Sequence, residues 1–470
     1  MRQDAVQERS PADAAAGAAV RTVPDEASAI VPAAEEGGLG RTDRQHFARH
    51  GALTFLFSAL TLGTNLLTGV VIARALGVSG RGQLTAILTV TQMVGWAFGL
   101  GCNEATAYYH ARNRDTAGVV TAWLIVLIPA GVVAVLVGEL VLPVALHAQS
   151  ETTLRLARLF MLSVVLTPLG LLKLGILLGT QRYLFYNAFG FAQPALTAAL
   201  YIVLWRLGAL STATGLTATL GVSLTLGVLL TLQTLKGRIA RPDWSQARKS
   251  IWYGIRAHGT NLGGMMNSRL DLMIIPAFLA ASSVGLYSVA TNISWVVVSI
   301  SAAIAAIVLP AAARRAEEGI PVVVHSLQAT LFVATLLASA IALVGGFALR
   351  TLYGSDFERG VVALRLLLPG SVCYACAAVL WSGLYALNRP LTAAASQALG
   401  LVVTVTGLSL FLAAGGIEVA ALVSTVAYAA VFASALVLYR RAANLAWREF
   451  VIPPAFPGPS PLARFSGSRP

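Results

Sequence analysis

Charged residues are scarce in this sequence: Asp, Glu, Lys and Arg together account for only 11% of its 470 residues. A water-soluble domain has about 25% charged residues. Hydrophobic residues make up 57% of the chain, which is more apolar surface than a water-soluble core can use. These proportions exclude an ordinary soluble protein and indicate a protein embedded in a membrane.

Cysteines are also rare, and the sequence lacks the spaced Cys and His residues that form metal sites. The three cysteines are Cys102, Cys373 and Cys376, and all lie in apolar stretches. Cys373 and Cys376 form a CxxC pattern, but inside an apolar helix we expect them to be small packing residues. No metal site is therefore predicted.

Common enzyme motifs are missing as well. The sequence contains no phosphate-binding loop of the GxxxxGK type, no HExxH and no GxSxG. We expect no external connection longer than about a dozen residues, which leaves no large loop to hold catalytic groups. The sequence therefore predicts no catalytic residues, no cofactor and no enzymatic activity.

Long apolar stretches fill the chain between Gly51 and Arg440. Each is about 20 residues long, enough for a helix to cross the roughly 30 Å of hydrocarbon in a bilayer. Twelve spans are predicted, at 52–73, 84–109, 118–146, 156–179, 185–206, 212–234, 255–280, 284–311, 321–349, 361–385, 391–414 and 416–439. The expected fold class is an all-α membrane protein of about twelve transmembrane helices.

The longest connection between the spans divides them into six and six. The predicted parts are a disordered cytoplasmic tail at 1–45, a six-helix bundle at 51–235, a basic cytoplasmic linker at 236–254, a second six-helix bundle at 255–440 and a cytoplasmic tail at 441–470. The first tail has no apolar segment of the kind found in a signal peptide. Two six-helix lobes of this kind would enclose a central cavity.

An internal repeat supports the division. Val71–Leu84 aligns with Ile274–Tyr287 at an offset of 203 residues, which pairs Gly82 with Gly285. Leu178–Leu184 aligns with Tyr385–Leu391 at an offset of 207 residues. Because each half has an even number of spans, both halves would insert with the same orientation.

Lys and Arg are concentrated in alternate connections between the spans. Positively charged connections stay in the cytoplasm, so this bias places both termini in the cytoplasm. The predicted location is the inner (cytoplasmic) membrane. The net charge of +13 has the same explanation, and no nucleic-acid partner is expected. For the basic linker, an ordinary cytoplasmic loop is the favoured interpretation, and contact with anionic lipid head groups is the alternative.

A few polar residues lie inside or close to the predicted spans. A charge at the bilayer centre costs roughly 2.5–3.5 kcal/mol on insertion scales, so such residues usually face a wet cavity or a partner. The predicted cavity residues are Asn65, Arg74, Arg81, Lys173, Arg269, Asp271 and Arg365. Arg269 and Asp271 are two positions apart and point in different directions on a helix, so they are not expected to pair with each other. Each charge alone could snorkel or form an ion pair between helices, but the excess of cations favours a cavity that attracts an anion.

The order of these features resembles the bacterial polysaccharide-export and oligosaccharide flippases of the multidrug/oligosaccharidyl-lipid/polysaccharide (MOP) exporter superfamily. The first matching segment is VIARALGVSGRGQLTAI, with Arg74, Leu76, Gly77 and Gly82. The second is NSRLDLMIIPAFLAASSVGLYSVATNISW with the Leu-Pro that follows it, and its matching positions are Asp271, Gly285, Tyr287, Ala290 and Pro310.

The resemblance implies two six-helix lobes that rock between inward-open and outward-open states around a cationic cavity. It also implies an undecaprenyl-pyrophosphate-linked saccharide as substrate, membrane lipids as surroundings, and a polysaccharide polymerase or glycosyltransferases as partners. The chain departs from two branches of the superfamily. Lipid II flippases usually have fourteen helices, and many drug and cation antiporters have an acidic residue in the first span, which is absent here.

Two other functions remain open at this point. One is export of small cationic drugs, which would favour carboxylates in the cavity. The other is a membrane-embedded enzyme or scaffold for glycan assembly.

Overall fold

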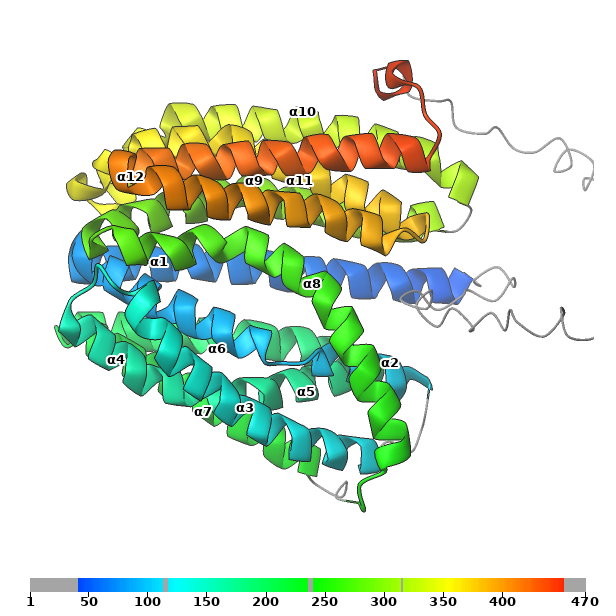
Figure 1. Cartoon of the computed structure of the whole chain (residues 1–470), viewed down its shortest axis with the longest axis horizontal. Coiled ribbons are helices and arrows are strands. Elements are labelled where there is room, and N and C mark those ends of the chain that lie inside the picture. The colour runs from blue at the N-terminus through cyan, green and yellow to red at the C-terminus, as the bar shows by residue number, and fades with distance from the viewer. Residues whose placement is uncertain (1–40, 113–116, 236–239, 314–315, 452–470) are drawn as a thin grey trace, which may run out of the picture. The chain divides into compact units, whose positions relative to one another are not determined.

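The computed structural model describes residues 41–112, 117–235, 240–313 and 316–451. The predicted first tail lies outside these residues except for its last few positions, and so does most of the predicted second tail. Within the described residues all regular structure is helical and there is no strand (Figure 1). The all-α fold class predicted from the sequence is confirmed.

The helices of the first half run from α1 to α7. They are α1 (Arg41–Ala97), α2 (Cys102–Arg112), α3 (Ala117–Ala145), α4 (Glu151–Met161), η2 (Leu162–Leu166), α5 (Thr167–Gly179), α6 (Tyr183–Arg206) and α7 (Thr212–Leu235). The second half comprises α8 (Trp244–Phe278), α9 (Ala281–Ala313), α10 (Ala316–Ala348), η3 (Leu349–Tyr353), η4 (Ser355–Gly360), α11 (Val361–Ala386), α12 (Pro390–Ala442) and η5 (Trp447–Phe450). We call the two halves the N-lobe and the C-lobe.

Two of the helices, α1 and α12, each contain two transmembrane segments joined at a glycine. Gly77 in α1 has φ 66° and Gly416 in α12 has φ 60°, a left-handed conformation that favours glycine because it has no Cβ. The chain folds back at both positions: the side chain of Arg81 reaches the Gly69 carbonyl oxygen at 2.8 Å, and a Cβ on Gly407 would lie 2.6 Å from Val423.

The number of membrane spans agrees with the sequence. Nine helical stretches among the described residues are long and apolar enough to cross a membrane. Two of these are the folded-back α1 and α12, which makes eleven crossing segments. The twelfth is α8, whose 35 residues include Arg269 and Asp271 and are therefore less apolar. The protein is a multi-pass membrane protein with about twelve spans in two lobes.

Both parts of the sequence repeat have structural counterparts. At the first offset, a Cβ on Gly82 would lie 1.7 Å from the Ala281 carbonyl oxygen, and a Cβ on Gly285 would lie 2.0 Å from the Val78 carbonyl oxygen. Val78 and Ala281 are themselves separated by the same offset of 203 residues, so the contact is reciprocal between the halves.

The second offset relates two identical turns. Gln181 and Asn388 have φ angles of 57° and 56°. In each turn the amide of the following arginine donates to a carbonyl five residues back, from Arg182 to Leu177 at 2.9 Å and from Arg389 to Leu384 at 2.8 Å. The two halves therefore repeat in structure as well as in sequence.

Helix α8 connects the lobes and begins earlier than the sequence suggested. Residues 244–254, predicted as linker, form its first turns, and the Asp243 side chain caps it by accepting from the amides of Ser245 at 3.0 Å and Gln246 at 3.1 Å. These hydrogen bonds, led by those from Ser245, lower the pKa of Asp243. A negative charge at this end is favoured by the helix dipole.

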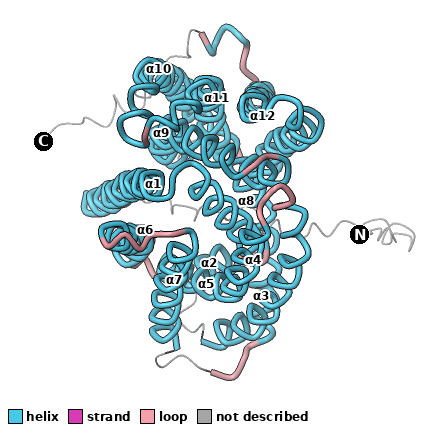
Figure 2. The backbone as a smooth tube through the Cα atoms, turned by 90° about the vertical axis from the view of Figure 1, so that its left-hand side faces the viewer, coloured by secondary structure: helices cyan, strands magenta, loops and turns pink. Residues whose placement is uncertain are grey.

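The two ends of α8 pack on different lobes. In its first turns Ser250 accepts a hydrogen bond from the Trp123 indole of α3 at 3.0 Å. In its last turns the Asn267 side chain donates to the Gln397 carbonyl of α12 at 2.7 Å. Helix α1 also contacts both lobes, because it packs against α6 and α9 (Figure 2). These two helices border the space between the lobes.

Candidate functional site

A cavity of about 730 Å³ lies between the N-lobe and the C-lobe. Both segments of α1, helix α6, the second half of α8 and the first half of α9 supply nearly all of its lining, and Leu174 of α5 and Tyr353 of η3 complete it. The elements of the repeat therefore form its walls, α1 from the N-lobe facing α8 and α9 from the C-lobe.

Arg81 is a buried cation at one end of this cavity. Its side chain is only 4% exposed. The guanidinium donates through Nη1 to the Gly69 carbonyl at 2.8 Å and through Nε to the Ser288 hydroxyl at 3.2 Å, and it lies 6.0 Å from the centre of the Tyr353 ring. No carboxylate pairs with it in the described part of the chain, so its positive charge is only partly compensated.

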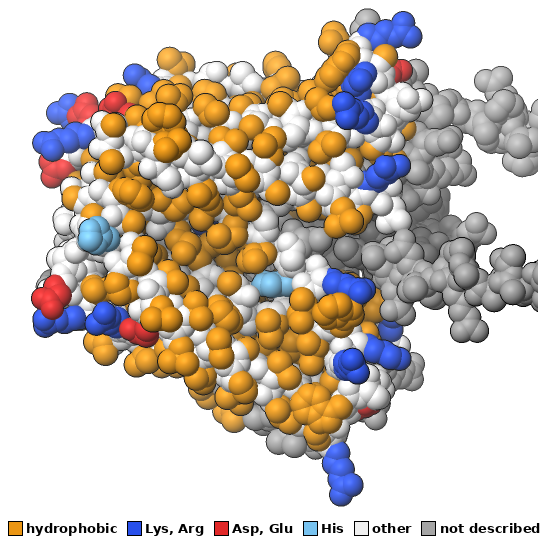
Figure 3. All heavy atoms as spheres, in the orientation of Figure 1, with side chains coloured by type: hydrophobic (Ala, Val, Ile, Leu, Met, Phe, Trp, Pro, Cys, Tyr) orange, Lys and Arg blue, Asp and Glu red, His pale blue; other side chains and the backbone are white. Residues whose placement is uncertain are grey.

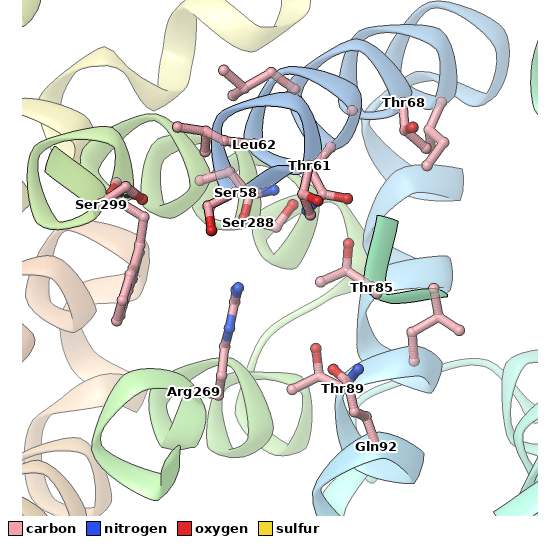
Figure 4. Close-up of a pocket in the computed structure, with 18 of the residues that line it drawn as sticks. Ser58, Thr61, Leu62, Thr68, Thr85, Thr89, Gln92, Arg269, Ser288 and Ser299 are labelled. Carbon is pink, nitrogen blue, oxygen red and sulfur yellow. Dashed lines mark hydrogen bonds between the residues drawn. The ribbon is translucent and has the colours of Figure 1, made fainter. Parts of the chain in front are cut away.

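Arg269 is the second cation of the lining. Its guanidinium lies 5.7 Å from the centre of the Trp295 ring, a cation–π contact. Figure 4 shows its side chain extending from α8 into the space bounded by Ser58, Ser288 and Thr85. Within the described residues Arg269 forms no ion pair and its side chain makes no hydrogen bond. Its five N–H donors are therefore available to a ligand.

The remaining polar groups of the lining are neutral. They are hydroxyls and amides from Ser58, Thr61, Asn65, Thr68, Thr85, Thr89, Gln92, Asn187, Ser288, Asn292 and Ser299, together with the Tyr186 and Tyr353 phenols. No Asp or Glu belongs to the lining in the part of the chain that the structure describes. The cavity is therefore electropositive and rich in groups that can hydrogen-bond to a polar ligand.

One end of the cavity is closed by contacts between the lobes. The backbones of α1 and α9 touch at Gly82 and Gly285. Around them, Arg74 of α1 donates to the carbonyls of Thr351 and Leu352, and the Gln149 amide donates to the carbonyls of Pro276 at 2.9 Å and Leu279 at 2.8 Å.

The seven residues predicted for the cavity fall into two groups. Asn65, Arg81 and Arg269 line it. Arg74, Lys173, Asp271 and Arg365 do not belong to its lining. A role in substrate binding stays a prediction for all seven.

The four residues outside the lining have other surroundings. Arg74 is exposed and takes part in the closed end. Lys173 is half-buried on α5, next to the lining residue Leu174. Arg365 is exposed, and its Nε donates to the Ala342 carbonyl at 3.2 Å. Arg365 therefore has a backbone carbonyl of α10 as its partner.

Asp271 is buried inside the C-lobe with 2% of its surface exposed. It accepts hydrogen bonds from the Tyr287 hydroxyl at 2.6 Å and from the Leu272 amide at 2.7 Å, and the Ser424 hydroxyl lies at 3.4 Å. Arg269 forms no ion pair with it among the described residues. As expected from their spacing, the two neighbours point in different directions.

Most of the neutral lining residues were not predicted from the sequence. A signal for them exists in α1, where Ser58, Thr61, Asn65 and Thr68 recur every three or four residues and so share one face of the helix. A search for polar stripes within apolar spans would have found this face.

No group of three or more potential metal ligands occurs among the described residues.

The sequence profile of a family described as polysaccharide biosynthesis protein matches residues 71–362, more than half of the chain. The chain belongs to this family. The resemblance drawn from the two segments of sequence is thereby confirmed. None of the curated proteins matches the chain.

Solved structures show the same fold at low sequence identity. The lipid II flippase MurJ in its inward closed conformation is 14% identical, with a TM-score of 0.69 over 84% of this chain and 89% of that one. A multidrug resistance MATE family transporter of the MOP superfamily in its inward-facing conformation is 15% identical, with a TM-score of 0.69 over 86% of this chain and 100% of that one. A multidrug resistance MATE family transporter of the MOP superfamily in its outward-facing conformation is 14% identical. Its TM-score is only 0.57, over 84% of this chain and 95% of that one. This polysaccharide biosynthesis family member therefore has the fold of the MOP superfamily.

Proposed function

We propose that this protein is a flippase that moves a lipid-linked saccharide with a pyrophosphate head group across the cytoplasmic membrane. The observation that carries the proposal is the lining of the cavity between the lobes, which contains the guanidinium groups of Arg81 and Arg269 and, within the described residues, no carboxylate. Such a site favours an anionic ligand and disfavours a cation.

The two arginines suit different parts of an anion-binding role. Arg269 offers free donors in the lining, where two oxygens of a phosphate group can accept two parallel hydrogen bonds from its guanidinium. Arg81 provides a second, buried positive charge, whose electrostatic effect is strong because little water surrounds it. Together they would hold the pyrophosphate, while the hydroxyls and amides around them would bind the first sugars.

The saccharide and the lipid would follow different paths. The cavity volume of about 730 Å³ falls in the range of sites for drug-sized molecules, roughly 300–1,000 Å³, and so suits a head group with its first sugars. The lipid chain would stay in the bilayer beside α1, which exposes the apolar side chains of Phe55, Leu56, Leu60 and Leu67.

Alternating access is the mechanism that fits this geometry. The closed end, around Gly82 and Gly285, is the end that the Lys and Arg distribution places outside. In Figure 3 Lys and Arg side chains appear at both ends, but Asp and Glu accompany them mainly at the end where α8 finishes, so the opposite end shows the larger excess of positive charge. The higher TM-score to the inward-facing MATE structure than to the outward-facing one is in keeping with a cavity that opens to the cytoplasm. We propose the inner membrane as its location, with both termini in the cytoplasm.

The other two functions have less support. An exporter of cationic drugs would benefit from carboxylates in the cavity, and the described lining has none. An enzyme or assembly scaffold would need reactive groups, or a docking surface for a polymerase or glycosyltransferase, that no described feature provides. Such proteins remain proposed partners in the supply or use of the saccharide.

The proposal is tested by binding measurements on the purified protein with undecaprenyl pyrophosphate and, for comparison, the neutral alcohol undecaprenol. Loss of charge-assisted hydrogen bonds costs about 1.5–3 kcal/mol, so Arg269→Gln should weaken pyrophosphate binding about 10- to 150-fold and leave undecaprenol binding unchanged. The control is Arg365→Gln, which removes the same charge from an exposed position outside the lining. Equal binding of the two lipids, or equal effects of the two variants, would contradict the proposal.

A further inference from the structure

We propose that the exposed face of the first four turns of α8 is a binding site for anionic phospholipid head groups. The face consists of Trp244, Ser245, Arg248, Lys249, Trp252, Ile255 and Arg256. We call it the basic face of α8. It is separate from the cavity, and the inference does not depend on the proposed function.

The burial pattern defines this face. Ala247, Ser250 and Gly254 are buried against the N-lobe, at the three- and four-residue spacing of one helix side. The exposed residues occupy the other side at the same spacing, with Trp244 49% exposed and Trp252 57% exposed. Two large indoles on the surface of a packed helix require an environment that is partly apolar.

The length of α8 places this face at the membrane surface. Its 35 residues span about 52 Å at 1.5 Å per residue, whereas the hydrocarbon core is about 30 Å thick. Roughly 20 Å of helix, about 15 residues, therefore extends beyond the hydrocarbon. The excess belongs to the first turns, because they carry Arg248, Lys249 and Arg256, whereas the second half of α8 is mostly apolar and its only charged residues are Arg269 and Asp271.

The chemistry of the face matches an anionic head group with its adjoining acyl chains. Three cations are exposed on this face. The carboxylate beside them, Asp243, is occupied in capping the helix, where it accepts from the amides of Ser245 and Gln246 and from the Ser245 hydroxyl. The Arg256 guanidinium lies 4.9 Å from the centre of the Trp252 ring, so a positive charge and an indole are presented together. Tryptophan is favoured at the level of the head groups, where its ring is apolar and its N–H can bond to phosphate or water.

Neighbouring groups extend and stiffen the face. Tyr253, next to Trp252, stacks on Tyr108 of α2 at 4.5 Å between ring centres, and Arg112 lies 4.3 Å from the same Tyr108 ring. The hydrogen bond from Trp123 to Ser250 ties these turns to α3. The helix that carries the charges is therefore fixed on the N-lobe, which lowers the entropy lost when a lipid binds.

The site has a consequence for α8 as a whole. Lipid bound at the basic face would hold the first turns of α8 on the N-lobe, while its last turns, with Arg269, stay packed on the C-lobe. The anionic lipid content of the membrane would then act on the helix that joins the two lobes.

Native mass spectrometry of the full-length protein tests the site by counting bound lipids. Phosphatidylglycerol and phosphatidylcholine of identical acyl chains are added separately. Each Lys or Arg near an anionic surface favours binding by about fivefold, so the triple variant R248Q/K249Q/R256Q should weaken phosphatidylglycerol binding by about 100-fold and leave phosphatidylcholine binding unchanged. Excess inorganic pyrophosphate at constant ionic strength should not displace the lipid, because it lacks the apolar chains that contact the indoles.

The matched control is R206Q/R350Q/R359Q, which removes three exposed arginines elsewhere and should have little effect on the lipid held at the basic face. Because loss of three cations can disturb membrane insertion, a second variant keeps every charge. The double variant Trp244→Ala and Trp252→Ala should weaken phosphatidylglycerol binding at least tenfold. Its control, Trp205→Ala, removes another exposed indole and should leave this binding unchanged. Equal binding of the two lipids by the natural protein would overturn the proposal, and so would full phosphatidylglycerol binding by the double tryptophan variant.

Discussion

The contact between Gly82 and Gly285 allows a sharp prediction about the two states of the transporter. A Cβ on Gly82 would lie 1.7 Å from the Ala281 carbonyl oxygen and 2.8 Å from the Gly285 nitrogen. Ordinary contacts are about 3.5 Å or longer, so Gly82→Ala must push α1 and α9 apart by about 1.5–2 Å. All the atoms involved are backbone, and no flexible side chain can move aside.

The cost should fall on one state only. Overpacking of this kind costs about 1–3 kcal/mol, and it applies only while the lobes are in contact at this end. If the lobes separate here in the other state, Gly82→Ala shifts the equilibrium toward that state by about 5- to 150-fold. Gly285→Ala should act in the same way, because its Cβ would lie 2.0 Å from the Val78 carbonyl oxygen.

Spin-label distances between positions 151 and 358 measure the shift. Glu151 is an exposed residue of the N-lobe and Glu358 an exposed residue of the C-lobe, and both lie near the closed end. We expect longer distances to become populated in Gly82→Ala and Gly285→Ala. The control is Gly63→Ala, also on α1, where a Cβ would have nothing within 4 Å. Correctly folded Gly82→Ala protein with an unchanged distance distribution would refute the reasoning.

Two further predictions concern a buried side chain and the orientation. Asp271→Ala removes the acceptor of the Tyr287 and Leu272 hydrogen bonds and leaves the buried Tyr287 hydroxyl with the Ser424 hydroxyl as its partner. Because loss of buried hydrogen bonds to a carboxylate costs about 1–3 kcal/mol, we expect a lower melting temperature with lipid binding retained. An unchanged melting temperature with binding lost would instead place Asp271 in the site. Reporter fusions after Arg112 and Arg440 should give a cytoplasmic signal, and a fusion at Gln149 should give an external signal. An external signal at Arg440 would contradict the orientation that we propose.

The sequence predicted the spans and the repeat because both depend on features that it displays directly. Apolar length indicates whether a segment can cross the bilayer, and the repeat is visible in paired residues such as Gly82 and Gly285. That these two glycines are also the place where the halves touch was not predicted. The start of α8 was not predicted, because the sequence there has the features of a loop. Its first turns carry cations that are typical of a cytoplasmic loop, while the signal for helix packing was only the small residues Ala247, Ser250 and Gly254.

The site was harder to predict, because a sequence does not show which side of a helix faces a cavity. The spacing of Arg269 and Asp271 predicted correctly that they diverge, but not that Arg269 faces the cavity and Asp271 the inside of the C-lobe. Arg365 has the same chemistry as Arg269, yet it lies at a surface where its long side chain reaches a carbonyl. These differences depend on the packing of neighbouring helices, which forms only in the folded protein.

The most direct test of the account is a translocation assay in proteoliposomes. A fluorescent undecaprenyl pyrophosphate-linked saccharide is placed in both leaflets, and a membrane-impermeant reagent reports the fraction on the outer face over time. We predict that the natural protein moves the lipid between leaflets and that Arg269→Gln slows this movement at least tenfold, while Arg365→Gln does not. Failure of the natural protein to move this lipid, together with uptake of a cationic dye by the same vesicles, would contradict the central claim.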